Sequence, residues 1–372
     1  MLNLNALAVA LAAISTAAQA ASVSGKPEGF GAGTTGGASG KTVTPTSTDE
    51  LTQYLESDEA LTVVLSTTFD YRKTEGTASE TGCAPYGTGS ACQIAINKDD
   101  WCSNYQASAP SASVTYDKAA LNPINVGSDK TIIGEGSKGV IMGKGLRVAN
   151  GAKNVIIQNI AISELNPQYV WGGDAITLDG SSNVWVDHVH TSNIGRQHIV
   201  TGNGKNTGVT ISNNFIDGET KWSANCNSYH YWAVYMTGTD DTITFKGNYI
   251  HHTSGRSPKL GGGATVHMVN NYWDENNGHA LEGESSYALF EGNIFQDVST
   301  PETDWSGSLY APSSSDSACQ STLGRSCVAN AYSGTGLKGT DSSVLSKVGK
   351  NAASAEATSD IGDVPSNAGN TL

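Results

Sequence analysis

The sequence predicts an all-β solenoid in which short strands stack in parallel as successive rungs. Three observations lead to this fold class. A pattern of alternating apolar and polar residues keeps returning between about residues 131 and 298. Its copies begin about 22 to 34 residues apart, a period typical of solenoids. No helix of ordinary length separates the copies, so the strands can follow one another directly from rung to rung.

Each copy has the features of a half-buried strand. It is about five residues long, alternates with period two and is rich in Val, Ile, Thr and Phe, the residues that favour strands. The longer intervals, 155–184 and 209–243, indicate loops inserted on one side of the solenoid, where chemistry is expected on a rigid scaffold. The copies occupy residues 130–136, 154–162, 183–191, 208–216, 241–250, 264–273 and 287–295.

Four copies carry an asparagine at the same offset. Stacked asparagine side chains can hydrogen-bond along a ladder, and a buried amide is unfavourable unless it is paired. We therefore interpret these residues as structural and not catalytic. They are Asn214, Asn248, Asn271 and Asn293.

The first 20 residues predict a signal peptide. They are uncharged, rich in Ala and Leu, and end in Ala-Gln-Ala, a small-x-small cleavage pattern. One feature fits poorly, because the first basic residue is Lys26. We expect a secreted, extracellular protein whose mature chain, 21–372, forms a single catalytic domain.

Both ends of the solenoid are predicted to be capped. Ser47 starts a segment to residue 57 that predicts a capped helix with Asp49 and Glu50 in its first turn. After Thr300 the repeat dissolves into Ser, Gly and Ala, and this tail is expected to fold back over the last rungs.

Composition and charge restrict the partners. The 43 glycines and 15% charged residues are typical of a turn-rich globular chain. A net charge of −14 would repel nucleic acid and fully ionised acidic polysaccharides, but not a neutral polymer. No uninterrupted apolar stretch is long enough for a membrane span. We expect a monomer that binds neither nucleic acid nor membrane.

Six cysteines in a chain that carries a predicted signal peptide favour disulfides. No Cys-x-x-Cys pair with a matching His or Cys pair is present, so a zinc site is not expected. Spacing alone leaves 15 connectivities open. The pair that is easiest to assign is Cys319 and Cys327, which would close a short loop.

Two motif matches are set aside. Residues 134–139 fit G-x-G-x-x-G, but another strand and turn follow instead of the helix that a dinucleotide site needs. The second is a set of histidines for which no third ligand is spaced to complete a metal site, so we interpret them as surface or stacked residues. They are His188, His190, His251 and His252.

Several segments together resemble the pectin lyase branch of the pectate lyase superfamily, over most of the mature chain. The resemblance implies a right-handed, single-stranded parallel β-helix with loop insertions that form a binding cleft. It also implies eliminative cleavage of methyl-esterified galacturonan to an unsaturated product, without bound metal or cofactor. The segments are Trp-Gly-Gly-Asp-Ala-Ile-Thr at 171–177, Val-Trp-Val-Asp-His at 184–188, Ile-Gly-Arg-Gln-His at 194–198, Val-Thr-Ile-Ser-Asn-Asn at 209–214 and Ser-Gly-Arg-Ser-Pro-Lys at 254–259.

Two departures separate this sequence from calcium-dependent pectate lyases. Asp174 matches their first acidic position, but Arg196 stands where a second acidic residue is expected. A guanidinium is permanently charged, so it removes a calcium ligand and can ion-pair with Asp174 in the place of the cation. The basic His-x-Lys clamp of pectate lyases is also not evident after Phe215, where 221–235 holds several aromatic residues.

The resemblance assigns Arg256, of the Arg-x-Pro motif, as the base that removes the C5 proton. A methyl ester makes this proton more acidic than a carboxylate does, so a nearby cation or hydrogen bond on the ester carbonyl can replace a metal. Arginine is a difficult base because its ordinary pKa lies above about 12. Repulsion from Lys259 and Arg196, and burial under bound polymer, are expected to make its deprotonation easier.

Aromatic side chains are the predicted binding surface, because sugar rings offer C–H faces that pack on Trp and Tyr. They are expected in the inserted loops and not on the repeating strands, and packing of the loops against the scaffold is the competing interpretation. The candidates are Trp101, Trp171, Trp232, Tyr86, Tyr105 and Tyr235.

Three alternatives remain open: a calcium-dependent pectate lyase, a β-helix hydrolase and a non-catalytic carbohydrate-binding solenoid. A hydrolase would need paired carboxylates, and the adjacent Asp240 and Asp241 lack supporting partners. The family resemblance also suggests a disulfide pattern, namely Cys83 with Cys102, Cys92 with Cys226, and Cys319 with Cys327.

Overall fold

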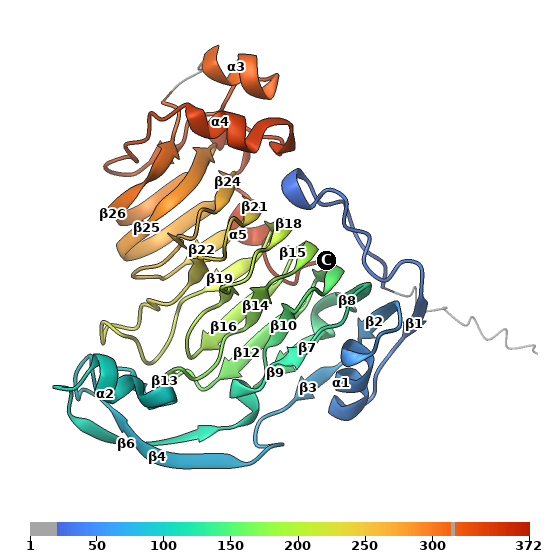
Figure 1. The fold of residues 1–372 in the computed structure, drawn as a ribbon, viewed down its shortest axis with the longest axis vertical. Coiled ribbons are helices and arrows are strands. Elements are labelled where there is room, and N and C mark those ends of the chain that lie inside the picture. The colour runs from blue at the N-terminus through green and yellow to red at the C-terminus, as the bar shows by residue number, and fades with distance from the viewer. Residues whose placement is uncertain (1–20, 314–316) are drawn as a thin grey trace, which may run out of the picture.

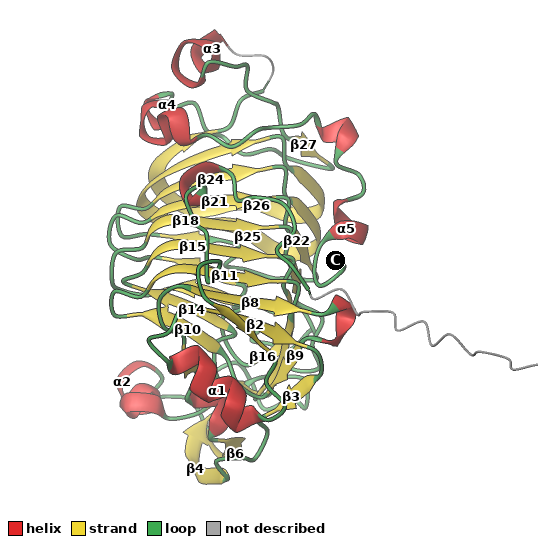
Figure 2. Cartoon of the chain, turned by 90° about the vertical axis from the view of Figure 1, so that its right-hand side faces the viewer, coloured by secondary structure: helices red, strands yellow, loops and turns green. Residues whose placement is uncertain are grey.

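The computed structural model describes residues 21–313 and 317–372 as a parallel β-helix, which confirms the predicted fold class. The predicted signal peptide, 1–20, lies outside the described residues. The chain winds through three stacks of parallel strands, and each turn adds one strand to each stack (Figures 1 and 2). Among the described helices, every one is too short or too polar to cross a membrane.

The second stack contains the strands that the repeat predicted. Each predicted copy begins in this stack, and the four copies with the aligned asparagine bend at that residue and continue into the third stack. The strands of the second stack are β1 (Lys41–Val43), β2 (Leu61–Leu65), β8 (Lys130–Gly134), β11 (Lys153–Gln158), β15 (Ser182–Asp187), β18 (Thr207–Ser212), β21 (Thr242–Lys246) and β24 (Thr265–Val269), followed by the end of β25 (Tyr272–Glu291).

The third stack follows each bend and is also parallel. It comprises β3 (Thr68–Asp70), β9 (Val140–Met142), β12 (Ala161–Leu165), β16 (His190–Ile194), β19 (Phe215–Asp217), β22 (Tyr249–His251), the start of β25, β26 (Ile294–Tyr310) and β27 (Ala331–Tyr332).

The first stack has the shortest strands and follows the longest loops. It comprises β7 (Ile124–Asn125), β10 (Leu146–Ala149), β14 (Ile176–Asp179), β17 (Ile199–Thr201), β20 (Val234–Met236) and β23 (Lys259–Leu260), and continues into β25.

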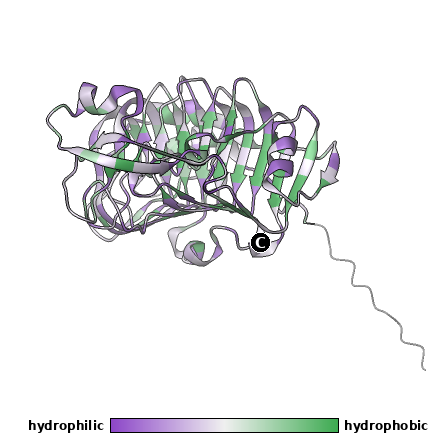
Figure 3. Ribbon diagram, turned by 90° about the horizontal axis from the view of Figure 1, so that it is seen from below, coloured by the Kyte–Doolittle hydropathy of each residue, from purple (hydrophilic) through white to green (hydrophobic). Residues whose placement is uncertain are grey.

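The core runs along the inside of the solenoid, where apolar residues of successive rungs are in register. Hydrophobic stretches recur from strand to strand along the stack (Figure 3). Burying each such side chain stabilises the fold by about 1.5–3 kcal/mol, so the repeat itself builds the core. One row, fully buried, is Val155, Val184, Val209, Ile243 and Val266.

The predicted asparagine ladder is confirmed. In each step the backbone N–H and the side-chain NH₂ of one asparagine donate to the Oδ1 of the next, at 2.8–3.0 Å, from Asn214 through Asn248 and Asn271 to Asn293. The ladder ends one rung later than predicted, at Asn330. Every amide is therefore paired, and the bend between stacks is repeated identically.

Helices lie over both ends of the stack (Figure 2). The predicted helix is α1 (Thr48–Glu56), capped by the Ser47 hydroxyl, which accepts from the Glu50 N–H, and it buries Leu51 and Leu55. At the other end, α4 (Ser343–Val348) packs on the last rungs beside α3 (Ser317–Leu323). The tail then returns past α5 (Val364–Asn367).

A side sheet projects from the solenoid below the first stack (Figure 1). Its strands β4 (Thr77–Cys83) and β6 (Ser111–Asp117) pair antiparallel, and the sequence did not predict them. It also contains β5 (Ile94–Ala95) and β13 (Tyr169–Val170), with α2 (Trp101–Tyr105) beside it.

Short 3₁₀ turns complete the fold. The G-x-G-x-x-G segment forms one of them and no α-helix, as predicted. They are η1 (Gly29–Gly31), η2 (Lys98–Asp100), η3 (Ala119–Leu121), η4 (Gly136–Lys138), η5 (Gly349–Asn351) and η6 (Thr358–Asp360).

Candidate active site

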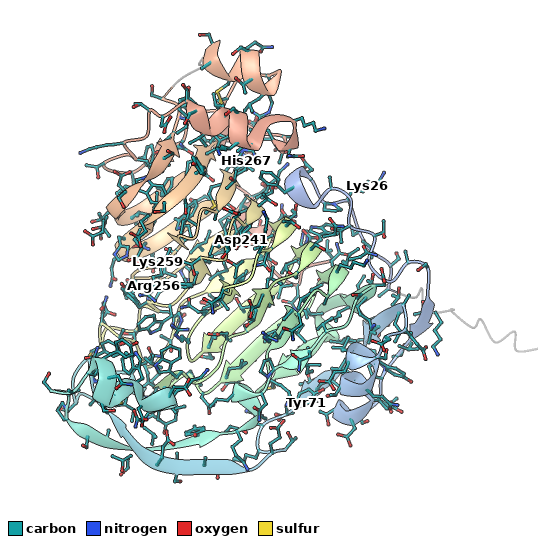
Figure 4. The ribbon with its side chains drawn as sticks, viewed as in Figure 1. Lys26, Tyr71, Asp241, Arg256, Lys259 and His267 are labelled. Atoms are coloured by element: carbon teal, nitrogen blue, oxygen red, sulfur yellow. A yellow bond between two sulfur atoms is a disulfide. The ribbon has the colours of Figure 1, made fainter. Side chains whose placement is uncertain are left out.

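The candidate site lies along the edge of the first stack where its strands begin. Asp174, Arg196 and Arg256 come shortly before β14, β17 and β23 respectively. Because β14 pairs with β17, β17 with β20, and β20 with β23, side chains far apart in the sequence meet at this edge. Figure 4 shows Arg256 and Lys259 close together there.

Arg256 is surrounded by aromatic rings. Its Cζ lies 5.6 Å from the ring centroid of Tyr231, 4.8 Å from that of Trp232 and 5.2 Å from that of Tyr235. The backbone carbonyl of Arg256 accepts a hydrogen bond from the Val234 N–H at 2.6 Å, which ties the loop before β23 to β20. The guanidinium is thus held against aromatic rings, and only a fifth of the Arg256 side chain is exposed.

A carboxylate that the sequence did not indicate binds Arg256. The Oε1 of Glu282, on β25, lies 3.2 Å from the Arg256 Nε and 3.3 Å from the Lys259 Nζ, and its Oε2 accepts from the His279 Nε2 at 2.7 Å. Burial alone would raise the pKa of Glu282, but the His279 hydrogen bond and the charges of Lys259 and Arg256 outweigh it and lower the pKa to about 2. Glu282 is therefore ionised at any working pH and forms ion pairs with both Arg256 and Lys259.

A cavity of about 270 Å³ brings together Asp174, Arg196 and Trp171. Two further cations line it, Lys98 and Arg147; the sequence analysis did not find them because they lie in segments outside the recognised motifs. Arg147 is neutralised by Asp179, with 2.8 Å between Nη2 and Oδ2.

The expected ion pair between Arg196 and Asp174 does not form, since no nitrogen–oxygen distance of 4 Å or less joins these two described side chains. The Arg196 guanidinium instead stacks 3.8 Å above the Trp171 ring, and the Asp174 Oδ1 accepts from the Gln197 N–H at 2.8 Å. Their charges still interact. Burial raises the pKa of Asp174 and lowers that of Arg196, while each charge opposes the shift of the other.

Two buried histidines hold the loop that carries Arg196. The His230 ring donates from Nε2 to the Arg196 carbonyl at 2.7 Å, and its ring lies 4.8 Å from that of His198. Burial lowers the pKa of His230 to about 4 and moves that of His198 well below its ordinary value. Both are neutral at working pH and act as structural supports.

The side sheet is anchored to the site through Gln93. Its NH₂ donates to the carbonyls of Pro167 and Gly195, each at 3.0 Å, and its Oε1 accepts from the Trp232 Nε1 at 3.0 Å. The residue before Gln93 is Cys92, whose disulfide with Cys226 is one of three among the described residues.

The disulfides are the three pairs that the resemblance suggested. Each joins segments outside the repeating strands or at their margins, and the first two tie the side sheet together and to the solenoid. They are Cys83–Cys102, Cys92–Cys226 and Cys319–Cys327.

The aromatic candidates divide into groups. Trp101 and Trp171 face each other edge to face at 6.0 Å near the cavity, and Tyr86 lies 6.1 Å from Trp232. Trp232 is only 8% exposed, so it packs the side sheet against the solenoid.

Of the remaining aromatic candidates, one lies in a different element from the one predicted, and one lies away from the other site residues. Tyr235 lies on β20 and not in a loop, in contrast to the prediction. Tyr105 is 73% exposed at the tip of α2 and has no place in the cluster around Arg256.

The interpretation of these histidines as stacked side chains is confirmed for His190, His251 and His252, each of which lies against an aromatic ring, whereas the expected lack of a third metal ligand is wrong. His188 pairs with Asp187 and lies apart from the others, whereas Glu275 approaches His251 and His252 from the next rung and supplies the third potential ligand that the spacing did not reveal.

Comparison with known proteins places these features in a family. The family model described as pectate lyase matches residues 2–371. Pectin lyase A of Emericella nidulans is 55% identical over 98% of both chains, and pectin lyase 2 of Aspergillus oryzae is 55% identical over 95% of this chain and 96% of its own.

Solved structures agree on the fold. A pectate lyase from Bacillus sp. N165 in complex with trigalacturonate superimposes with a TM-score of 0.57 at 19% identity, covering 92% of this chain and 98% of that one. Jun a 1, the major allergen from cedar pollen, gives 0.55 at 19% identity with 92% of each chain covered. The match of the family model over nearly the whole sequence, together with relatives at 55% identity, shows that the chain belongs to the pectate lyase family.

Proposed function

We propose that this protein is a pectin lyase, which cleaves α-1,4-linked, methyl-esterified galacturonan within the chain by β-elimination and releases 4,5-unsaturated oligosaccharides. The relatives named pectin lyases, 55% identical over nearly the full length, support this assignment. So does the arrangement of cations and aromatic rings along the first stack.

The observation that carries the proposal is the guanidinium of Arg196 stacked on Trp171 beside Asp174. Calcium needs six to eight oxygen ligands, yet Asp174 belongs to no group of three or more potential metal-binding side chains within the described ranges. The donor set therefore does not fit calcium. A permanent positive charge beside Asp174 suits a substrate whose carboxyl groups are esterified and bring no charge of their own.

Arg256 is the proposed base. In its neutral form it takes the proton from C5; the electron pair of that bond forms the C4–C5 double bond, the C4–O glycosidic bond breaks, and the leaving oxygen takes a proton from solvent. Negative charge develops on the ester carbonyl, where Lys259 can stabilise it. Arg256 and Lys259 contact the same oxygen of Glu282, so this carboxylate fixes the base relative to the cation.

Sugar binding is assigned to the aromatic rings beside the cations. Trp171, Trp101 and Tyr235 stand next to the cavity or next to Arg256, where C–H faces can stack. Tyr86 is more buried, and burial raises its pKa to about 12, so its hydroxyl remains a hydrogen-bond donor. Trp232 supports the others by packing.

The protein is proposed to work outside the cell as a monomer. Its three disulfides are typical of an oxidising compartment, and its polymeric substrate is too large to be taken up whole.

The test is cleavage of highly methylated pectin in excess EDTA, followed by the ultraviolet absorbance of the unsaturated product. Activity is expected to persist under chelation and to fall as the same pectin is progressively de-esterified. Loss of turnover with EDTA and its recovery with calcium would assign the protein as a pectate lyase. Absence of the product band with every pectin would leave a carbohydrate-binding solenoid.

A further inference from the structure

A cluster of imidazole and carboxylate groups lies on the third stack, apart from the residues assigned to catalysis. His251 ends β22 and His252 follows it, while Glu275 lies on β25 of the next rung. Asp217 ends β19 of the preceding rung and is the register partner of His251. Three successive rungs therefore bring these side chains together.

The three side chains lie close together, and the His252 Nδ1 and the Glu275 Oε2 form a hydrogen bond. The His252 Nδ1 lies 3.0 Å and the His251 Nε2 3.8 Å from the Glu275 Oε2, and the ligand atoms of these three residues all lie within 4.8 Å of one another. A separation of 3.8 Å is too long for a hydrogen bond. Two ligands bound tetrahedrally at about 2.1 Å from a metal lie roughly 3.4 Å apart, so only small side-chain rotations are needed.

The second nitrogen of His251 faces another carboxylate. Its Nδ1 lies 3.8 Å from the Asp217 Oδ1, is buried, and has no hydrogen-bond partner among the described residues. Metal-binding histidines commonly direct their other ring nitrogen to a carboxylate, which fixes the tautomer and the ring orientation.

Aromatic stacking fixes both rings. Tyr229 stacks on His252 with 3.6 Å between centroids, and Tyr249 lies 5.4 Å from His251 at an angle of 22°. The site remains open to solvent, because half of the Glu275 side chain and about a fifth of each histidine are exposed. An ion can enter and keep a water ligand.

We propose that His251, His252 and Glu275 form a binding site for a divalent late transition-metal ion such as Zn²⁺, with Asp217 orienting His251. Two imidazoles and one carboxylate suit zinc, copper or nickel and not calcium or magnesium, which prefer oxygen ligands. His251 and His252 begin the turn that leads to Arg256, and Glu275 lies on the next rung. Bound metal would therefore connect the two rungs and stabilise this part of the solenoid.

Titration of the purified, EDTA-treated and desalted full-length protein with ZnCl₂, followed by calorimetry, tests the proposal. One saturable site per chain is expected, with a rise of a few degrees in Tm. His252→Asn and Glu275→Gln are each expected to weaken zinc binding at least about tenfold. Asparagine is chosen because His252 has a φ of 56°, which asparagine tolerates.

The matched control is His188→Asn, a histidine with a φ of 50° outside the cluster, which is expected to bind zinc like the unmodified protein. A second readout is the visible absorption of bound Co²⁺, expected with His188→Asn and lost with His252→Asn. The proposal is overturned if zinc shows no saturable site, or if both cluster variants bind it as tightly as the control. Because none of these readouts uses pectin, they do not depend on the proposed enzymatic activity.

Discussion

At the scale of single residues, Arg256 combines two opposing influences. Its ionic contact with Glu282 and the faces of three aromatic rings stabilise the guanidinium as a cation, whereas a base must be neutral. We infer that Glu282 orients the Arg256 guanidinium in the free enzyme. Arg256 then acts as a base only after the bound polymer has excluded water from the site.

Arg256→Lys is expected to lower kcat on methylated pectin by about 10²- to 10⁴-fold with little change in KM, because a general base acts in the transition state. Lysine keeps the charge but loses the Nε contact with Glu282 and the contact of the guanidinium with the Trp232 ring. Initial rates of product absorbance measure kcat and KM, and thermal unfolding shows whether the fold is kept. Retention of most of kcat would assign the base to another residue.

Glu282→Gln is expected to lower stability in a pH-dependent manner. A folded-state pKa of about 2 against an ordinary 4.5 contributes about 3 kcal/mol above pH 4.5, and this contribution is lost as the pH falls towards 2. Urea unfolding should show a gap between wild type and variant at pH 7 that closes at low pH. Glu284→Gln, an exposed neighbour on the same strand, is the control. A gap that is constant with pH would contradict this account.

Sequence reasoning located Arg256, Lys259, Arg196 and Asp174 because these residues lie in recognisable motifs. It did not find Glu282, which is the register partner of Lys259 one rung later. Register across a long irregular strand follows from how the intervening loop closes, and this is not encoded in any local pattern. The absence of the Arg196–Asp174 ion pair has a similar cause, because Trp171 competes for the guanidinium.

At the scale of elements, prediction succeeded where strands are long and alternate regularly. The second stack from β8 onwards and α1 were predicted because their periodicity or capping is local, whereas β1 and β2 lie outside the predicted repeats. The strands of the first stack are as short as two residues, and the side sheet pairs β4 with β6 across an irregular segment, so neither has a periodic signal. The placement of Tyr235 in a loop was wrong for this reason.

Gln93 connects the side sheet to the loops that precede the first stack, and Gln93→Leu tests this connection. It would leave the carbonyls of Pro167 and Gly195 and the Trp232 N–H without partners, each at roughly 1–3 kcal/mol. We expect a lower Tm and a several-fold higher KM for pectin, because the loops that carry Arg196 and Trp232 lose their support. The measurement is pectin kinetics beside thermal unfolding, with Gln53→Leu on the exposed face of α1 as control. Unchanged KM would show that the side sheet does not position the site.

At the scale of the whole molecule, the net charge of −14 contrasts with the cavity, where Lys98 and Arg196 lie beside Asp174 and Arg147 is paired with Asp179. The long-range field repels an ionised polymer, while the charges in the cavity act only on the part of the substrate that is already bound. The two act over different distances, so added salt separates them.

Raising the ionic strength from about 0.01 to 0.1 M shortens the screening length from about 30 to 10 Å. The KM for partially de-esterified pectin is therefore expected to fall, roughly two- to fivefold, while that for fully esterified pectin stays constant. Steady-state kinetics on the two substrates in parallel provide the comparison. An equal change for both would mean that surface charge does not discriminate between them.

The helices over the two ends of the stack bear on aggregation. Parallel strands in register, with an asparagine ladder running through them, share the geometry of cross-β fibrils, in which any uncovered final strand is a template for the next molecule. Leu51 and Leu55 of α1 occupy the apolar end at one side, and Val344 and Leu345 of α4 do so at the other. The two helices therefore cover the apolar ends of a fibril-like architecture, which hinders a second copy from adding a strand to these rungs.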